Sequence, residues 1–124
     1  MSDLTSIKDE APAVRNEVIT DCMLLLCKQK KPEKAVQAAE LLAEWATLSN
    51  DVYNAACAYS LCIPLVESKE TRGQYAKRAV QLLRQAAAKG FNEVEKYRQD
   101  SDLDALRQHP DFNNFLAEVE KKLT

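Results

Sequence analysis

The stretch NDVYNAACAYSLCI, residues 50–63, decides the fold class of this chain. Its apolar residues recur at intervals of three and four, which is the period of one face of an α-helix. They are Val52, Ala55, Ala56, Tyr59 and Ile63. Ser49 is a suitable N-cap, and Pro64 ends or kinks the helix because proline lacks the N–H donor. The spacing predicts an amphipathic helix over residues 50–63.

Two further helices are predicted before this stretch. Apolar residues with the helical period occupy residues 12–29: Val14, Val18, Ile19, Cys22, Met23, Leu25 and Leu26. The segment Lys30-Lys31-Pro32 ends this helix, and Pro32 suits the first turn of a second helix over residues 32–47. The apolar face of the second helix is Ala35, Val36, Ala38, Ala39, Leu42, Trp45 and Ala46. Its small side chains allow a neighbouring helix to approach closely.

A fourth long helix is predicted after a polar connection at residues 65–70. Thr71 and Gln74 have the spacing of a capping box at its start. Its buried stripe is Tyr75, Ala76, Ala79, Val80, Leu82, Leu83, Ala86 and Ala87. Gly90 stands where a left-handed C-terminal cap is expected, with Phe91 as the accompanying hydrophobic contact.

The last thirty residues predict a helical cap on this array. We expect short helices at residues 93–97 and 102–107, the second capped by Ser101, and a last helix at residues 111–123. The stripe of the last helix is Phe112, Phe115, Leu116, Val119 and Leu123. Together with Phe91 and Tyr97, its aromatic residues are suited to cover the exposed end of the fourth helix.

Composition supports a single all-α domain. The chain has 124 residues, which is enough for one core, and only two glycines, four prolines and eight aromatic residues (one Trp, four Tyr, three Phe), too few for an all-β fold. Seventeen alanines and fifteen leucines favour helices, and no segment reads as a strand. The net charge of -2 gives no general attraction to nucleic acid or to an anionic membrane. No apolar run approaches the ~20 residues of a membrane span, and residues 1–10 are too polar for a secretory signal, so we expect a cytoplasmic protein.

The helices contain a weak internal repeat. Ile19-x2-Cys22-Met23-x2-Leu26 followed by Ala35-x3-Ala39 recurs as Val52-x2-Ala55-Ala56-x2-Tyr59 followed by Ala79-x3-Leu83. Positions 19 and 52 are 33 residues apart, and positions 35 and 79 are 44 apart, which is the same period with eleven residues inserted. We predict a flexible N-terminus at 1–11, a first repeat at 12–47, a second at 49–91 with an insert near 62–74, and a cap at 92–124.

This pattern resembles the tetratricopeptide (TPR) repeat. The best matches are residues 53–59, YNAACAY, and residues 28–36, KQKKPEKAV. Residues 53–65, the helix ending in Gly90-Phe91, and the segment DLDALRQHPDF at 102–112 also look like the C-terminal TPR segment of some bacterial serine/threonine protein kinases. The chain has no glycine-rich loop, His-Arg-Asp or Asp-Phe-Gly motif of the kinase itself. The resemblance implies a right-handed α-α superhelix of about two helix pairs, acting as an adaptor in bacterial signalling.

Few residues suggest catalysis or metal binding. Cys22 and Cys27, like Cys57 and Cys62, are five positions apart, about 140° around a helix, so neither pair presents both thiols to one zinc ion. We interpret them as small buried residues at helix contacts. We interpret the other titratable residues as structural. His109 lies in a turn, and Asp100, Asp102 and Asp104 cap a helix start. The basic cluster is a solvated turn between helices, formed by Lys28, Lys30, Lys31 and Lys34. We therefore expect a protein that is not an enzyme and has no cofactor or metal.

The resemblance implies a groove on the concave face, lined by the first helix of each pair, that receives a peptide or helix of a protein partner. Carried over position by position, the lining residues are Thr20, Leu24, Cys27, Lys28, Asn50, Tyr53, Asn54, Cys57 and Ser60. Only Asn54 matches the clamp that family members use to bind a terminal carboxylate, so we expect a more apolar groove. The alternative is a self-association or metal- or redox-responsive module, which uses the cysteines or a homodimer contact through Val14, Val18 and Leu25.

Overall fold

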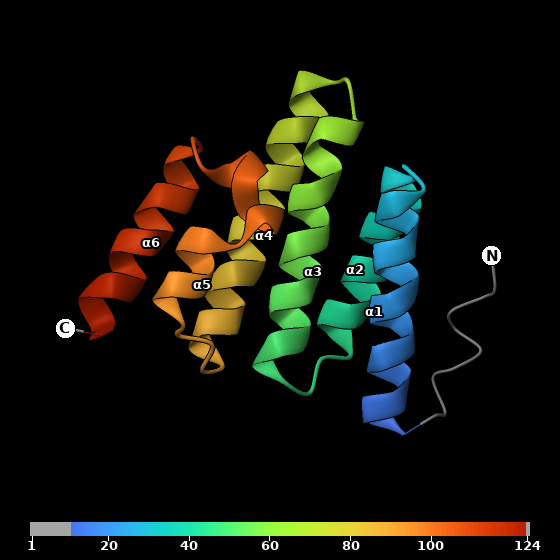
Figure 1. The fold of residues 1–124 in the computed structure, drawn as a ribbon, viewed down its shortest axis with the longest axis horizontal. Coiled ribbons are helices and arrows are strands. Elements are labelled where there is room, and N and C mark those ends of the chain that lie inside the picture. The colour runs from blue at the N-terminus through green and yellow to red at the C-terminus, as the bar shows by residue number, and fades with distance from the viewer. Residues whose placement is uncertain (1–10, 124) are drawn as a thin grey trace.

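The computed structural model describes residues 11–123 of the chain, and over these residues it is all-helical, with no strand. The elements are α1 (Pro12–Lys28), α2 (Pro32–Glu44), α3 (Ser49–Cys62), η2 (Ile63–Leu65), α4 (Lys69–Ala88), α5 (Val94–Gln99), η3 (Ser101–Leu106) and α6 (Pro110–Leu123), where η denotes a 3-10 helix. Successive helices lie beside one another across the molecule from α1 to α6 (Figure 1). The prediction of an all-α fold is confirmed. The flexible segment predicted at residues 1–11 falls almost wholly outside the described residues.

Helix α3 is the centre of the core. It packs against α2 on one side and α4 on the other, and it also contacts α1 and η3. Every residue from Ala55 to Ser60 is therefore buried, not only the stripe that periodicity predicts. Helices on several sides bury α3 on most of its circumference, which explains why it carries small and aromatic residues and few charges.

The first turns of three helices differ from the sequence predictions. Ser49 does not cap α3; the Asp51 carboxylate does so by accepting from the backbone N–H groups of Thr47 (3.3 Å) and Leu48 (3.4 Å). The capping box predicted at Thr71 is wrong, because α4 begins earlier and the Ser68 hydroxyl accepts from the Thr71 N–H at 3.3 Å. For η3, the cap is the Asp100 carboxylate and not Ser101.

Two left-handed residues end helices. Gly90 has φ +111°, and the next amide, Phe91 N–H, donates to the Ala86 carbonyl at 2.9 Å, so the predicted cap is confirmed. Lys30 has φ 59° and ends α1 in the same way, with the Lys31 N–H donating to the Leu26 carbonyl at 3.0 Å. A lysine in this conformation is uncommon, and no glycine or asparagine marks this position in the chain.

The insert predicted near residues 62–74 is mostly helical. After α3, η2 continues the chain through Pro64, and residues 66–68 alone connect it to α4. The polar residues Lys69 and Glu70, expected in the connection, form the first turn of α4. A 20-residue α4 absorbs the extra length, so the insert lengthens a helix instead of a loop.

Candidate protein-binding groove

An open groove runs between α1 and η3, with the end of α3 as its floor. One part of it, here called the apolar hollow, has a volume of about 380 Å³. It is lined by Leu24, Cys27, Lys28, Leu61, Leu65 and Asp102. Three of these, from α1, are residues predicted for the concave groove. The other three come from α3, η2 and η3. Helical periodicity does not predict them, because it does not reveal that η3 packs against α3.

A second hollow lies between the N-terminal parts of α1 and α3. It measures about 230 Å³ and is lined by Ala13, Asn16, Glu17, Thr20, Asp21, Thr47, Leu48, Asn50, Asp51 and Asn54. Three of the predicted groove residues, Thr20, Asn50 and Asn54, are found here. Glu17, Asp21 and Asp51 make this end of the groove acidic, whereas the apolar hollow carries one lysine and one aspartate.

Three predicted groove residues are core residues instead. Tyr53, Cys57 and Ser60 are 2%, 3% and 0% exposed, so they offer no surface to a partner. The segment formed by α5 and η3 returns over α3 and covers them. This part of the predicted groove is filled by the chain itself.

The covering segment is fixed by aromatic contacts and one aspartate. The Tyr53 ring stacks on Phe91 at 4.4 Å between centroids, and Tyr97 meets Tyr53 edge-on at 5.8 Å. The Tyr53 hydroxyl donates to the Asp100 carboxylate. Arg107 donates to the backbone carbonyls of Tyr97 (2.6 Å) and Asp100 (2.7 Å), which holds the turn between α5 and η3 in place.

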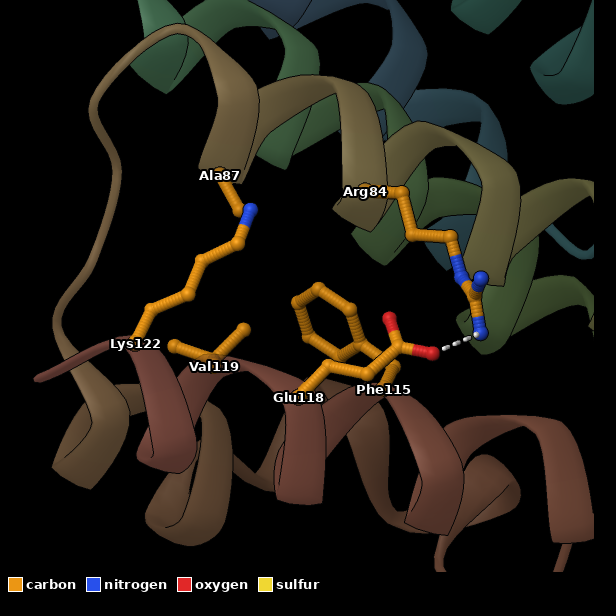
Figure 2. A pocket seen from close by; sticks show the side chains of 6 residues that line it. All are labelled: Arg84, Ala87, Phe115, Glu118, Val119 and Lys122. Carbon is orange, nitrogen blue, oxygen red and sulfur yellow. Dashed lines mark ion pairs between the residues drawn. The ribbon is translucent and has the colours of Figure 1, made fainter. Parts of the chain in front are cut away.

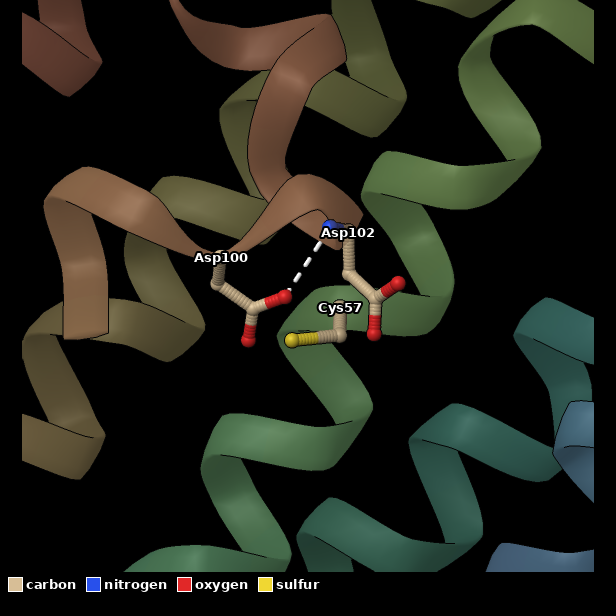
Figure 3. Close-up of side chains that lie close together, drawn as sticks. All are labelled: Cys57, Asp100 and Asp102. Atoms are coloured by element: carbon tan, nitrogen blue, oxygen red, sulfur yellow. Dashed lines mark hydrogen bonds between the residues drawn. The ribbon is translucent and has the colours of Figure 1, made fainter.

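Cys57, Asp100 and Asp102 form a small cluster beneath this turn (Figure 3). One potential ligand atom from each lies within 4.8 Å of the others. Burial raises the pKa of the Cys57 thiol well above its usual range, and the nearby Asp100 raises it further. Burial and then the charge of Asp100 also raise the pKa of Asp102. Asp100 is already engaged by the Tyr53 hydroxyl and by the Asp102 N–H at 3.0 Å, so the cluster serves as an anchor of the cap on α3.

The cysteines meet across helices, not within the pairs seen in the sequence. The Cys27 and Cys62 sulfur atoms, from α1 and α3, are 3.9 Å apart. The hydrogen bond from Cys62 lowers the pKa of Cys27 despite its partial burial, and the same bond, with burial, raises the pKa of Cys62. The two residues are 35 positions apart in the chain, and no sequence pattern indicates their contact. Cys22 is half-buried and has no thiol partner among the described residues.

The other candidate residues have structural roles. His109 is half-buried in the turn before α6, where its Nδ1 accepts from the Asp111 N–H at 3.3 Å. The lysine cluster, Lys28, Lys30, Lys31 and Lys34, is exposed around the turn between α1 and α2. Neither feature forms a second site with the groove residues, apart from Lys28 at its edge.

A smaller hollow of about 140 Å³ lies on another face, between α4 and α6 (Figure 2). Phe115 and Val119 form its floor, and the Arg84 to Glu118 ion pair of 3.3 Å crosses its edge. Lys122 extends from α6 toward Ala87 on α4 (Figure 2). Half-exposed ion pairs of this kind contribute little to stability, and the hollow is too small to rival the groove.

Comparisons with protein-family models, curated proteins and solved structures find no match to this chain. Among the described residues, no helix has the length and apolar character required to cross a membrane. The geometry of the chain itself therefore carries the functional argument.

Proposed function

We propose that the protein is a non-catalytic interaction module of two TPR-like helix pairs and a helical cap, which binds a peptide or helix of a protein partner in the groove along α1. The order of contacts, α1 to α2 to α3 to α4, is the order that stacked helix pairs require. The setting we propose, bacterial signalling, rests on the sequence resemblance to kinase-linked TPR segments alone.

The apolar hollow is the single observation that carries this proposal. Its volume of about 380 Å³ exceeds the ~150 Å³ of a cavity that takes up benzene, so it has room for a large apolar side chain. Leu24 is 36% exposed beside it, at the solvent edge of α1. Lys28 and Asp102 flank it with opposite charges. We therefore propose a partner segment with one apolar anchor residue between an acidic and a basic residue.

Two features support a binding role over catalysis. The Cys57 thiol is buried and its pKa is raised, so it stays protonated and is a poor nucleophile. The ring nitrogen Nδ1 of His109, the one histidine of the chain, is engaged by a turn amide. The groove instead offers surface and shape, which is what a recognition module needs.

Adjacent leucines on α1 provide a matched test. Leu24 lines the apolar hollow, whereas Leu25 is 53% exposed and lies outside it. Peptides are selected from a random display library on the wild-type protein, and their affinities are measured by fluorescence polarisation for Leu24→Glu and Leu25→Glu. We expect Leu24→Glu to weaken binding at least about tenfold, a loss of ~1.4 kcal/mol, and Leu25→Glu to leave it unchanged. Equal affinity for both variants, or no selected peptide, would overturn the proposal.

The alternative is self-association through the outer face of α1. Val14, Val18 and Leu25 are 50%, 42% and 53% exposed on that helix. Their spacing of four and seven residues aligns them along one stripe. Exposed apolar stripes of this kind are favourable dimer contacts, so self-association is the second candidate function of α1.

A further inference from the structure

The contact between Cys27 and Cys62 is unused by the proposed function. The two residues lie in the last turns of α1 and α3 respectively, which are the first helices of the two pairs. Their sulfur atoms are 3.9 Å apart, and Cys62 also lies 3.9 Å from the Pro32 carbonyl. We propose that Cys27 and Cys62 form a peroxide-reactive dithiol that closes to an intramolecular disulfide.

Exposure assigns different roles to the two thiols. Cys27 is half-buried and lines the apolar hollow, which opens to solvent, so a small oxidant reaches it directly. Cys62 is fully buried behind it. The pKa of Cys27 is lowered by the Cys62 hydrogen bond, which favours the thiolate at the accessible sulfur. Cys27 is therefore the attacking thiol and Cys62 the resolving thiol.

The reaction balances with a peroxide as oxidant. The Cys27 thiolate attacks one peroxide oxygen, the O–O bond breaks, and the leaving oxygen takes a proton to become water or an alcohol. Cys27 is then a sulfenic acid. The Cys62 sulfur attacks the Cys27 sulfur, the S–O bond breaks, and the departing hydroxide takes the Cys62 proton as water. Two thiols have lost two electrons, and one peroxide has gained them.

The geometry requires only a local movement. A disulfide bond is ~2.0 Å long, so the sulfur atoms must approach by about 1.9 Å from their separation of 3.9 Å. Both residues lie in the last turn of their helix, where side chains and backbone adjust more easily than at a helix centre. Closure also moves one wall of the apolar hollow. An effect on partner binding rests on the proposed function, whereas disulfide formation does not.

Intact-protein mass spectrometry tests the inference. The full chain is reduced, freed of reductant, titrated with hydrogen peroxide, and quenched with an alkylating agent. We expect wild-type protein to lose two hydrogen atoms and two alkylation sites. Cys22→Ser, which removes a half-buried thiol outside the Cys27–Cys62 contact, is the matched control and is expected to lose the same mass. Cys27→Ser is expected to lose neither. Cys62→Ser is expected to form no disulfide and instead to add one oxygen at Cys27, with the loss of one alkylation site.

Peptide mapping of the oxidised wild-type protein keeps the test independent of the variants, because Cys62→Ser alters a buried site. A peptide linking residue 27 to residue 62 is the expected result, with an increase in Tm of several degrees that reductant reverses. A link through Cys22 or Cys57, a disulfide between two chains, or stable oxidation of Cys27 without a link would overturn the inference. Peptide affinity measured on both redox forms then reports separately on the groove.

Discussion

The α1–α2 pair and the α3–α4 pair differ in how much of their first helix is open to solvent. The α1–α2 pair leaves α1 open, with Leu24, Cys27 and Lys28 along the groove. The α3–α4 pair has the equivalent face of α3 covered by α5 and η3. Seven of the eight aromatic residues lie from Tyr53 onward, and only Trp45 precedes it. The difference teaches that α5 and η3 occupy on α3 the kind of surface that stays open to solvent beside α1.

The two regions are also held by different forces. In the C-terminal region, the rings of Tyr53, Phe91, Tyr97 and Phe115 meet at 4.4 to 5.8 Å. At the N-terminal end, a polar contact ties three segments: Asn16, 2% exposed, donates to the Trp45 carbonyl at 3.0 Å and to the Asp51 carboxylate at 3.2 Å. To the apolar core that both regions share, the C-terminal region adds buried rings and the N-terminal end adds a buried amide.

The largest expected effect on stability comes from a substitution in the C-terminal region. Tyr97 is fully buried, contacts three other rings, and donates its hydroxyl hydrogen to the Phe91 carbonyl. We expect Tyr97→Ala to lower the free energy of unfolding by about 4 kcal/mol, measured by urea denaturation, because it removes a large buried ring. Tyr97→Phe keeps the ring and is expected to cost about 1 kcal/mol. A loss below 1 kcal/mol for Tyr97→Ala would show that the cap is not part of the core.

The N-terminal counterpart is Asn16→Ala. It removes the amide that joins α1 to the end of α2 and the start of α3, and it leaves the Trp45 carbonyl without this donor. We expect the free energy of unfolding to fall by about 2 kcal/mol in the same assay. The exposed neighbour Glu17 offers a control, because Glu17→Ala is expected to change the free energy of unfolding by less than ~0.5 kcal/mol. Equal effects of the two variants would contradict the role given to Asn16.

Periodicity predicts the long helices well because their buried stripes are local patterns. The N-terminal caps of α3 and α4 are harder to predict. Asp51 and Ser68 cap these helices, although Ser49 and Thr71 are also good capping residues. Which residue caps depends on where the preceding chain enters the helix, and that path is set by tertiary packing. The Gly90 cap was predictable because only glycine adopts its φ of +111° at little cost.

The groove was predictable only in part, for a related reason. Tyr53 and Cys57 share the helix face that carries groove residues in stacked repeats, so helical position alone assigns them to the groove. Their burial depends on the turn at Asp100 that brings η3 back over α3. The pairing of Cys27 with Cys62 likewise depends on how α1 packs on α3. Contacts between distant segments leave no periodic signal in a single sequence.

The ion pair between Glu40 on α2 and Arg78 on α4 is expected to have a smaller, pH-dependent effect on stability. Arg78 on α4 donates to both carboxylate oxygens of Glu40 on α2, at 2.7 and 2.8 Å, and the Tyr59 hydroxyl donates to the same group at 2.5 Å. The Arg78 hydrogen bond lowers the pKa of Glu40 below its ordinary value of 4.5. A lowered folded-state pKa stabilises the fold above the ordinary pKa, and this stabilisation disappears as the pH falls through the folded-state value.

Glu40→Gln measures this contribution. Because Glu40 and Arg78 are 44% and 30% exposed, solvent screening limits the loss at pH 7 to about 1 kcal/mol or less. Urea denaturation at pH 7 and at pH 3 is expected to show a difference between wild type and Glu40→Gln that shrinks at pH 3, as the wild-type carboxyl gains its proton. A difference that grows toward pH 3 would contradict the lowered pKa.

The smallest expected effect concerns the open outer face of α1. Val18 is 42% exposed, so Val18→Asp is expected to change the free energy of unfolding by less than ~0.5 kcal/mol. If the groove alone carries recognition, light scattering coupled to size exclusion gives the mass of one chain, 13.9 kDa, for wild type and variant alike. A wild-type dimer that Val18→Asp dissociates would instead show that α1 binds a second copy through this face. The open side of the first pair would then be an interface, as the covered side of the second pair already is within the chain.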